Sequence, residues 1–265
     1  MSRRDRSGSV VAIIPARLGS TRFPRKALAD ETGTPLVVHV CEAASRAERV
    51  SRVVVATDSD EIGDVCRGGG FEAVLTGEHP NGTSRLVEAT DRLGLDATEI
   101  VVNVQGDEPE IEGEIIDGAV VALEATGGAL GGLAASVGTV VSPIRDEADA
   151  ADPNIVKAAL GVLDPETGVA RSLYFSRAVV PHDRDQDGVV RRFRHLGIYA
   201  YRVGTLREYP ALGETPCERA ERLEQLRWLE HGRLINGAVR DASHAGIDTP
   251  EQYRAFVARW RQGNS

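Results

Sequence analysis

Short runs of β-branched residues alternate with helical patterns along the first half of the chain, and this alternation constrains the fold more than any other feature. Both faces of each run are apolar, as in strands that are buried on both sides of a parallel sheet. The runs lie at residues 10–14, 53–56, 100–104 and 155–160. This rhythm of strand and helix favours an α/β fold with a doubly wound, mostly parallel sheet.

Helix boundary signals separate these runs. Thr34-Pro35 opens a helix, and residues 58–61 resemble a capping box whose helix is closed by three glycines at residues 68–70. Further helices are predicted at residues 82–93, 112–125, 218–231 and 250–261, and a further strand at residues 195–202. The stretch 142–194 is less regular and rich in Asp, Pro and Arg. It predicts a smaller inserted subdomain.

Composition narrows the classes of function. The formal net charge is −9, whereas a nucleic-acid binder relies on a basic face that neutralises phosphates. The three cysteines are far apart in the sequence and form no CxxC pair, so we expect reduced thiols rather than a disulfide framework or a zinc site. No stretch approaches the roughly 20 apolar residues of a membrane helix. We therefore expect a soluble, cytoplasmic protein without nucleic-acid or membrane partners.

A basic loop follows the first predicted strand. Residues 15–26 read PARLGSTRFPRK and contain the cations Arg17, Arg22, Arg25 and Lys26. Ligands of open α/β sheets bind beyond the carboxyl ends of the strands, where fixed cations and backbone amides can cradle a triphosphate. The loop is neither a Walker loop nor a GxGxxG fingerprint, which disfavours ordinary kinases and dehydrogenases. A solvated basic loop stays open as the alternative.

Two acidic stretches are candidates for metal binding. Asp107-Glu108 follows the strand at 100–104 in VVNVQGDEP, and carboxylates at a strand end commonly hold Mg²⁺ against phosphate oxygens. Gly106 would let the backbone approach a ligand closely. A turn in which Asp107 caps the next helix is the alternative. Asp248 lies in GIDTPE, and the local pattern alone favours its interpretation as a helix N-cap.

At these three places the sequence resembles the 3-deoxy-manno-octulosonate cytidylyltransferases, also called CMP-Kdo synthetases. The resemblance runs from about Val10 to the last predicted helix, and the most specific combination is VNVQGDEP with RHLGIYAYR and LEQLR. The other matching blocks, in order, include IIPARLGSTRFPRKAL, VVVATDSDEI, DPNIVKAAL, LYFSRAVVPHDRD and GIDTPEQ. The family implies a Rossmann variant of the nucleotide-diphospho-sugar transferase type with an inserted smaller subdomain for sugar binding and dimerisation.

The resemblance also implies a reaction and its residues. CTP and the anomeric hydroxyl of an acidic eight-carbon sugar, 3-deoxy-manno-octulosonate (Kdo), would give CMP-Kdo and pyrophosphate for lipopolysaccharide biosynthesis. The implied catalytic residues are Arg17, Lys26, Asp107 and Asp248, with Mg²⁺ on the two aspartates, which overrides the cap interpretation of Asp248. The implied CTP-binding residues are Arg17, Lys26, Gln105, Gly82 and Arg85. The implied sugar-binding residues are Arg177, His195, Tyr199, Glu224 and Gln225.

Each sugar-side residue has a structural alternative. Arg177 and His195 could be hydrogen-bond partners within the fold, and Tyr199 could belong to the core. Glu224 and Gln225 fall in the middle of a predicted helix, where a solvated face is the ordinary interpretation.

Two departures from the family pattern concern the nucleotide side. Ser84 stands where the family usually has an acidic residue, and Arg25 where it commonly has glycine. Arg25 adds a cation and a Cβ at a position where glycine would permit an unusual φ. These changes leave open the choice of base and of sugar, including 8-amino-Kdo or a sialic-acid-like nonulosonate, and a non-catalytic nucleotide-binding homologue.

The expected domain organisation follows from the same resemblance. Residues 1–9 form a flexible tail, residues 10–140 the nucleotide-binding part, and residues 141–265 the sugar-binding and dimerisation part. The last segment would return Asp248 to the metal site. The family implies a homodimer.

Overall fold

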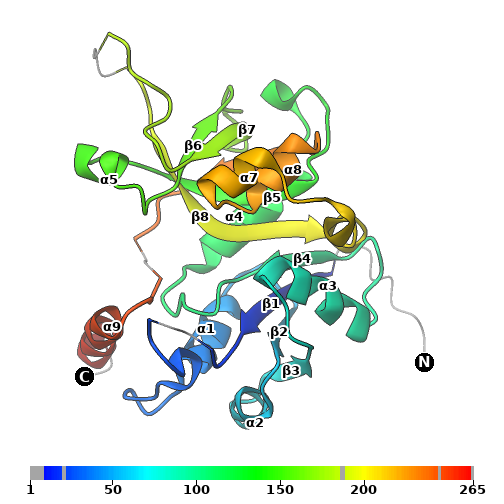
Figure 1. Ribbon diagram of the computed structural model, residues 1–265, viewed down its shortest axis with the longest axis vertical. Coiled ribbons are helices and arrows are strands. Elements are labelled where there is room, and N and C mark those ends of the chain that lie inside the picture. The colour runs from blue at the N-terminus through cyan, green and yellow to red at the C-terminus, as the bar shows by residue number, and fades with distance from the viewer. Residues whose placement is uncertain (1–8, 20–21, 186–188, 244–245, 264–265) are drawn as a thin grey trace. The chain divides into compact units, whose positions relative to one another are not determined.

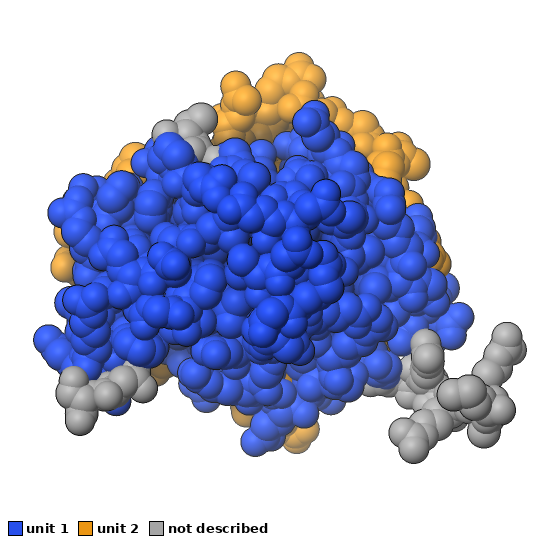
Figure 2. All heavy atoms as spheres, turned by 90° about the horizontal axis from the view of Figure 1, so that it is seen from below, with its two compact units in different colours: residues 1–116, 243–265 blue, residues 117–242 orange. Residues whose placement is uncertain are grey.

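The computed structural model of the protein describes residues 9–19, 22–185, 189–243 and 246–263. The tail predicted at residues 1–9 therefore lies, except for Ser9, outside the described residues, as do Ser20 and Thr21 of the basic loop. The chain divides into two compact units, which Figure 2 colours separately. Unit 1 comprises residues 1–116 and 243–265, and unit 2 comprises residues 117–242. The division falls inside helix α4 (Gly113–Glu124) rather than near residue 140.

Unit 1 contains a parallel sheet with the strand order β3-β2-β1-β4. Its strands are β1 (Val10–Ala16), β2 (Arg52–Thr57), β3 (Glu72–Leu75) and β4 (Ile100–Asn103). The chain moves outward from β1 to β3 and then returns to the other side of β1. Its helices are α1 (Leu36–Ala44), α2 (Asp60–Gly68) and α3 (Gly82–Arg92), with the short 3₁₀ helix η1 (Lys26–Leu28) in the basic loop. The reversal makes the β1–β4 pair the topological switch point, where such sheets bind ligands.

The last helix, α9 (Pro250–Gly263), belongs to unit 1. Its residues Tyr253, Phe256 and Val257 form one buried cluster with Leu36 of α1 and with Ile247. The burial of this apolar face fixes the C-terminal segment against the N-terminal half of unit 1. Two of the cysteines, Cys41 and Cys66, are buried free thiols in α1 and α2.

Unit 2 contains a mixed sheet with the order β8-β5-β9-β7-β6. Its strands are β5 (Val137–Pro143), β6 (Lys157–Leu160), β7 (Val169–Ser176), β8 (Phe193–Arg202) and β9 (Ile235–Val239). The β5–β9 pair is parallel, whereas β5–β8, β6–β7 and β7–β9 are antiparallel. The sheet curls so far that β6 also pairs with the start of β8. The mostly parallel sheet thus describes unit 1, and the inserted unit has its own antiparallel pattern.

Short helices complete unit 2. They are α5 (Glu147–Ala151), α6 (Val203–Leu206), α7 (Pro216–Glu221) and α8 (Gln225–Glu230), with 3₁₀ turns η2 (Gly128–Leu130) and η3 (Tyr209–Ala211). Helices α7 and α8 lie side by side, and α8 packs on β7 (Figure 1). Among the helices of the described ranges, none is both long and apolar enough to cross a lipid bilayer.

The single helix predicted at residues 218–231 is wrong. Arg222 adopts the left-handed conformation (φ 55°, ψ 49°) directly after α7, and α8 begins only at Gln225. A left-handed residue turns the chain out of the first helix. Glu224 is therefore the N-cap residue of α8 and not a mid-helix residue.

Candidate active site

The ends of β1 and β4 place two predicted site segments at one edge of the unit 1 sheet. Ile13 pairs with Asn103 in parallel register, so the residues after both strands emerge together. Gly106 then passes directly over the end of β1, because a Cβ at this position would lie 2.7 Å from the carbonyl oxygen of Pro15. Real Cβ atoms do not approach so closely. A contact within the chain therefore already requires glycine at this position.

Lys26 joins the two candidate metal ligands. Its Nζ lies 2.8 Å from Oδ2 of Asp107 and 3.6 Å from Oδ1 of Asp248. It also donates to the carbonyl oxygen of Ile247 over 2.6 Å. The Lys26 side chain is only 15 % exposed, so these contacts are partly shielded from water. Residues from three distant parts of the sequence therefore converge at the switch point.

The local interpretation of Asp248 as a helix cap is wrong, because its neighbour fills that role. The hydroxyl of Thr249 accepts from the N–H of Gln252 (3.4 Å). The side-chain oxygen of Gln252 accepts in return from the N–H groups of Asp248 (2.7 Å) and Thr249 (3.0 Å). This reciprocal capping box satisfies the start of α9. The carboxylate of Asp248 is thereby left to pair with Arg22 Nη2 at 2.9 Å.

The donor set at this edge suits a hard divalent cation. Two carboxylates, Asp107 and Asp248, face the positive charges of Lys26 and Arg22. Within the described part of the chain no three or more His, Cys, Asp or Glu residues form a metal cluster. Mg²⁺ is usually held by one or two carboxylates and completes its shell with water and substrate phosphates. Burial, and to a smaller extent the charges of Asp107 and Glu112, raises the pKa of Glu108 to about 8.

The implied nucleotide-side residues also lie in unit 1. Arg17 follows β1, is exposed, and has no ion pair or hydrogen bond to any described residue. Gln105 follows β4, and Gly82 begins α3, where a Cβ would lie 3.6 Å from Pro15 Cγ. A cation, a helix N-terminus and a strand end thus surround the switch point.

Arg85 behaves differently from the other implied CTP-binding residues. It is 4 % exposed, and its guanidinium donates to Oδ2 of Asp58 and to Oγ1 of Thr76, each over 2.6 Å. Asp58 follows β2 and Thr76 follows β3. Arg85 therefore braces the ends of two strands from α3, and the structure gives its charge a protein partner.

The departure at Arg25 has a backbone consequence. Arg25 adopts φ 57° and ψ 25°, in the left-handed region that favours glycine. Its guanidinium pairs with Glu61 at the start of α2. Glu61 thus neutralises the added cation at the surface. The turn that leads into Lys26 contains a residue with a Cβ in the left-handed region, which is a strained conformation.

In unit 2, His195 and Tyr199 share one face of β8. Their ring centroids are 5.3 Å apart, and the His195 ring also lies 4.8 Å from that of Phe175 in an edge-to-face arrangement. Burial lowers the pKa of His195 to about 3, so the imidazole is neutral near pH 7. Burial, and then the charge of Glu224, raises the pKa of Tyr199. Glu224 is thus close enough to act on the same face electrostatically.

Arg177 follows β7 and is fixed by backbone carbonyls. Its Nε donates to the carbonyl oxygen of Glu221 (2.8 Å) and its Nη1 to that of Pro153 (2.9 Å). Its own N–H donates to Oε2 of Glu221 (2.9 Å), whose Oε1 accepts from Ser176 (2.6 Å). No described residue contacts Nη2 within hydrogen-bond distance. The guanidinium is therefore held in a fixed plane with donor capacity remaining.

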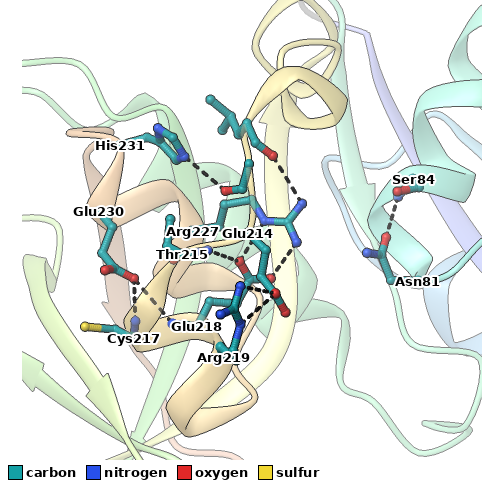
Figure 3. Close-up of polar contacts among 12 residues, drawn as sticks. Asn81, Ser84, Glu214, Thr215, Cys217, Glu218, Arg219, Arg227, Glu230 and His231 are labelled. Carbon is teal, nitrogen blue, oxygen red and sulfur yellow. Dashed lines mark hydrogen bonds and ion pairs between the residues drawn. The ribbon is translucent and has the colours of Figure 1, made fainter.

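The α7–α8 pair positions Glu224 and Gln225. Arg227 donates to both carboxylate oxygens of buried Glu218 (2.8 and 2.6 Å) and lies 4.5 Å above the ring of Tyr209 (the Glu218 contacts are drawn in Figure 3). Glu230 accepts from the N–H groups at the start of α7. Gln225 is 5 % exposed, and its side chain has no hydrogen bond to the described residues. The Gln225 amide therefore keeps free hydrogen-bonding capacity at the start of α8.

Some contributing residues were not among the sequence-based candidates. Arg22 was noted only as part of the basic loop, although it pairs with Asp248. Glu221 holds Arg177, and Thr139 contacts His195. Their signal is a contact between distant strands or loops, which no local pattern contains.

Comparison with known proteins identifies the family. A model of the cytidylyltransferase family matches residues 11–235. The 3-deoxy-manno-octulosonate cytidylyltransferase of Acidovorax sp. (strain JS42) is 45 % identical over 262 residues, covering 93 % of this chain and 95 % of the relative. That of Leptothrix cholodnii is 44 % identical over 263 residues, covering 93 % and 90 %.

A solved CMP:2-keto-3-deoxy-manno-octonic acid synthetase in complex with CTP is also similar. Its TM-score is 0.84 at 35 % identity, with 96 % of this chain and 99 % of that chain covered. A cytidylyltransferase from Leptospira borgpetersenii, with a TM-score of 0.56 at 16 % identity, shares the fold. The chain therefore belongs to the 3-deoxy-manno-octulosonate cytidylyltransferase family, as the sequence motifs indicated.

Proposed function

We propose that the protein transfers CMP from CTP to the anomeric hydroxyl of Kdo and releases pyrophosphate, a step that activates the sugar for lipopolysaccharide biosynthesis. The observation that carries the proposal is the convergence of Asp107, Asp248 and Lys26 at the switch point of unit 1. The family indicates the substrates, since the relatives at 44–45 % identity are named 3-deoxy-manno-octulosonate cytidylyltransferases.

The nucleotide side of the reaction falls to unit 1. Arg17 and Lys26 would bind the β- and γ-phosphates, because fixed cations beside a strand end neutralise a polyanion. Asp107 and Asp248 would hold Mg²⁺. When bound, this ion would neutralise phosphate charge and polarise the α-phosphate. Phosphoryl-group chemistry of this kind needs alignment and charge neutralisation more than covalent catalysis. Gln105 and the N-terminal turn of α3 at Gly82 would line the nucleoside.

The sugar side falls to unit 2. The fixed guanidinium of Arg177 would pair with the sugar carboxylate, whose planar shape it matches. Gln225 would donate hydrogen bonds to sugar hydroxyls and accept from them, because its amide has both a donor and an acceptor and no hydrogen bond to the described residues. Glu224 would accept hydrogen bonds from sugar hydroxyls. The rings of His195 and Tyr199 would line one side of the sugar site and offer polar atoms to it. The neutral state of His195 disfavours a role as counter-ion for the carboxylate.

Three properties complete the proposal. We expect a homodimer, as the family implies, and the exposed apolar side chains of unit 2, such as Leu133, Val162 and Leu173, are candidates for its interface. We expect a cytoplasmic location, where buried thiols stay reduced. We expect Mg²⁺ to be required, because phosphate oxygens and aspartates are its preferred ligands.

The test is release of pyrophosphate from CTP with Mg²⁺ and a panel of acidic sugars. We expect turnover with Kdo, and the loss of turnover on addition of EDTA with recovery on excess Mg²⁺. Faster turnover with 8-amino-Kdo or a sialic-acid-like nonulosonate would move the proposal to that sugar. CTP binding without turnover on any of these sugars would instead favour a non-catalytic nucleotide-binding homologue.

A further inference from the structure

Strands β5 and β8 of unit 2 pair through an irregularity beside His195. Thr139 pairs with Tyr199, but the next residue, Val140, pairs with Leu196. Gly197 and Ile198 therefore form a bulge in β8. A bulge interrupts the ladder of backbone hydrogen bonds and leaves carbonyl groups that need another donor.

The hydroxyl of Thr139 fills this need. Thr139 is fully buried (0 % exposed), and its Oγ1 lies 2.7 Å from the carbonyl oxygen of Ile198. The carbonyl oxygen of Leu196 is farther away, at 3.4 Å. A carbonyl oxygen only accepts, and a threonine hydroxyl carries one hydrogen. The Thr139 hydrogen is therefore committed to Ile198.

The same hydroxyl lies 3.0 Å from Nε2 of His195. Because the Thr139 hydrogen points to Ile198, Oγ1 can only accept from Nε2. Nε2 must then carry the hydrogen of the neutral imidazole, and Nδ1 must carry the lone pair. In the described residues Nδ1 has no hydrogen-bond partner. The ring is held between Phe175 and Tyr199, so rotation that would exchange the two nitrogens is opposed by packing.

We propose that Thr139 is a positioning residue that fixes His195 as the Nε2–H tautomer and thereby makes Nδ1 an acceptor for a hydroxyl of the sugar. This inference rests on the proposed function. It adds the direction of one hydrogen bond, in which the sugar hydroxyl donates and Nδ1 of His195 accepts. A lone pair selects a substrate group that carries a hydrogen, such as a hydroxyl, and disfavours a carboxylate or carbonyl oxygen at that place. It also separates the task of His195 from that of Arg177, which is cationic.

The test combines a spectroscopic and a kinetic measurement on the full chain. Long-range ¹H–¹⁵N correlation spectra of the imidazole nitrogens distinguish the tautomers of His195. We expect the Nε2–H form in the wild type and in Thr139→Ser, which keeps the hydroxyl. In Thr139→Val, which keeps the shape and removes the hydroxyl, we expect a mixture of tautomers or the Nδ1–H form.

The kinetic expectation follows from the loss of one oriented hydrogen bond. Thr139→Val should raise KM for Kdo about tenfold, which is the effect of one such bond. KM for CTP and kcat should stay within about twofold, and Thr139→Ser should restore KM for Kdo. A merely structural role would lower stability without this selective change.

Each outcome decides a separate part of the inference. An Nδ1–H tautomer in the wild type overturns it, and this measurement needs no variant to fold. An unchanged tautomer in Thr139→Val removes the positioning role. A changed tautomer with unchanged KM for Kdo removes the sugar contact. Wild-type protein that turns over no Kdo while showing the Nε2–H form would refute the proposed function and leave the tautomer assignment intact.

Discussion

Asp107 and Ile247 are joined backbone to backbone, because the N–H of Ile247 donates to the carbonyl oxygen of Asp107 over 2.8 Å. This bond brings the segment that carries Asp248 to the end of β4 without the help of either carboxylate. The capping box of Thr249 and Gln252 fixes the same segment from its other side. The geometry of the two carboxylates is thus set by the backbone, and their charges are left for chemistry.

We predict that Asp107→Asn and Asp248→Asn each lower kcat/KM for pyrophosphate release by at least about 10²-fold, with little change in the melting temperature. Each change removes one charge that would hold Mg²⁺ and keeps the size of the side chain. The backbone bond between Asp107 and Ile247 should preserve the fold. The measurement is steady-state turnover over a series of Mg²⁺ concentrations, together with thermal unfolding.

Glu251→Gln is the matched control for these variants. Glu251 lies three residues after Asp248 and pairs with Arg254 in an exposed contact at 2.8 Å. Its loss changes the net charge by the same amount in the same segment, and we expect turnover within about twofold of the wild type. Near-normal turnover of either aspartate variant at saturating Mg²⁺ would rule out its role as a metal ligand.

The sequence predicts unit 1 well because the information there is local. Strands such as β1 are apolar on both faces, and caps such as Ser59 mark the starts of helices. Unit 2 is less predictable because the order and direction of its strands depend on pairing between segments that are distant in the sequence. The sequence did not predict the break at Arg222, because the run ERAERLEQLRWLEH contains no glycine or proline and consists mostly of good helix formers.

The site shows the same division. Asp107 and the basic loop could be found from their places after strands, whereas Asp248 was assigned only through the resemblance to the family. Their partners could not, because Lys26 reaches Asp248 only through tertiary contacts. Arg85 shows the reverse case, since a basic residue next to a predicted nucleotide loop is occupied by Asp58 and Thr76. The burial of Arg85 and its pairing with Asp58 depend on the fold, and the local sequence around Arg85 does not reveal them.

We predict that Arg177→Lys raises KM for Kdo nearly as much as Arg177→Ala, by about tenfold or more, with KM for CTP unchanged. A lysine keeps the charge but cannot bond the carbonyls of Glu221 and Pro153 while it offers a planar pair of donors. Arg145→Ala is the control, because Arg145 is exposed and, among the residues that the structure describes, pairs only with Asp241. A raised KM for CTP with an unchanged KM for Kdo would assign Arg177 to the nucleotide.

We predict that Arg25→Gly is more stable than Arg25→Ala by about 1 kcal/mol. Both variants lose the exposed pair with Glu61, which contributes less than about 1 kcal/mol. Alanine keeps the left-handed strain at φ 57°, whereas glycine relieves it. Urea unfolding of the three proteins gives the comparison. Equal stability of the two variants would show that the turn before Lys26 is not strained.

We predict that Glu88 stabilises the fold at neutral pH and that this contribution disappears in acid. Its Oε2 lies 2.5 Å from Nε2 of His79 and accepts from the N–H of Gly77 (2.9 Å). Its Oε1 accepts from Arg92 Nε (2.7 Å). These contacts, of which the His79 bond is the strongest, lower the pKa of Glu88 from 4.5 to about 2. Glu88 thereby ties the loop at residues 77–79 to α3, whose first turn contains Gly82.

The sign of the pH dependence follows from this lowered pKa. The folded protein holds Glu88 ionised more strongly than the unfolded chain does, so the stabilisation is complete above about pH 4.5 and is lost as the pH falls towards 2. Glu88→Gln should cost about 1–3 kcal/mol of unfolding free energy at pH 7. The difference from the wild type should shrink between about pH 4.5 and 2 in urea unfolding. Asp64→Asn, which breaks an exposed pair with Arg67, should cost less than about 0.5 kcal/mol at pH 7. A gap between wild type and Glu88→Gln that stays constant down to pH 2 would show that the carboxylate contacts do not stabilise the loop.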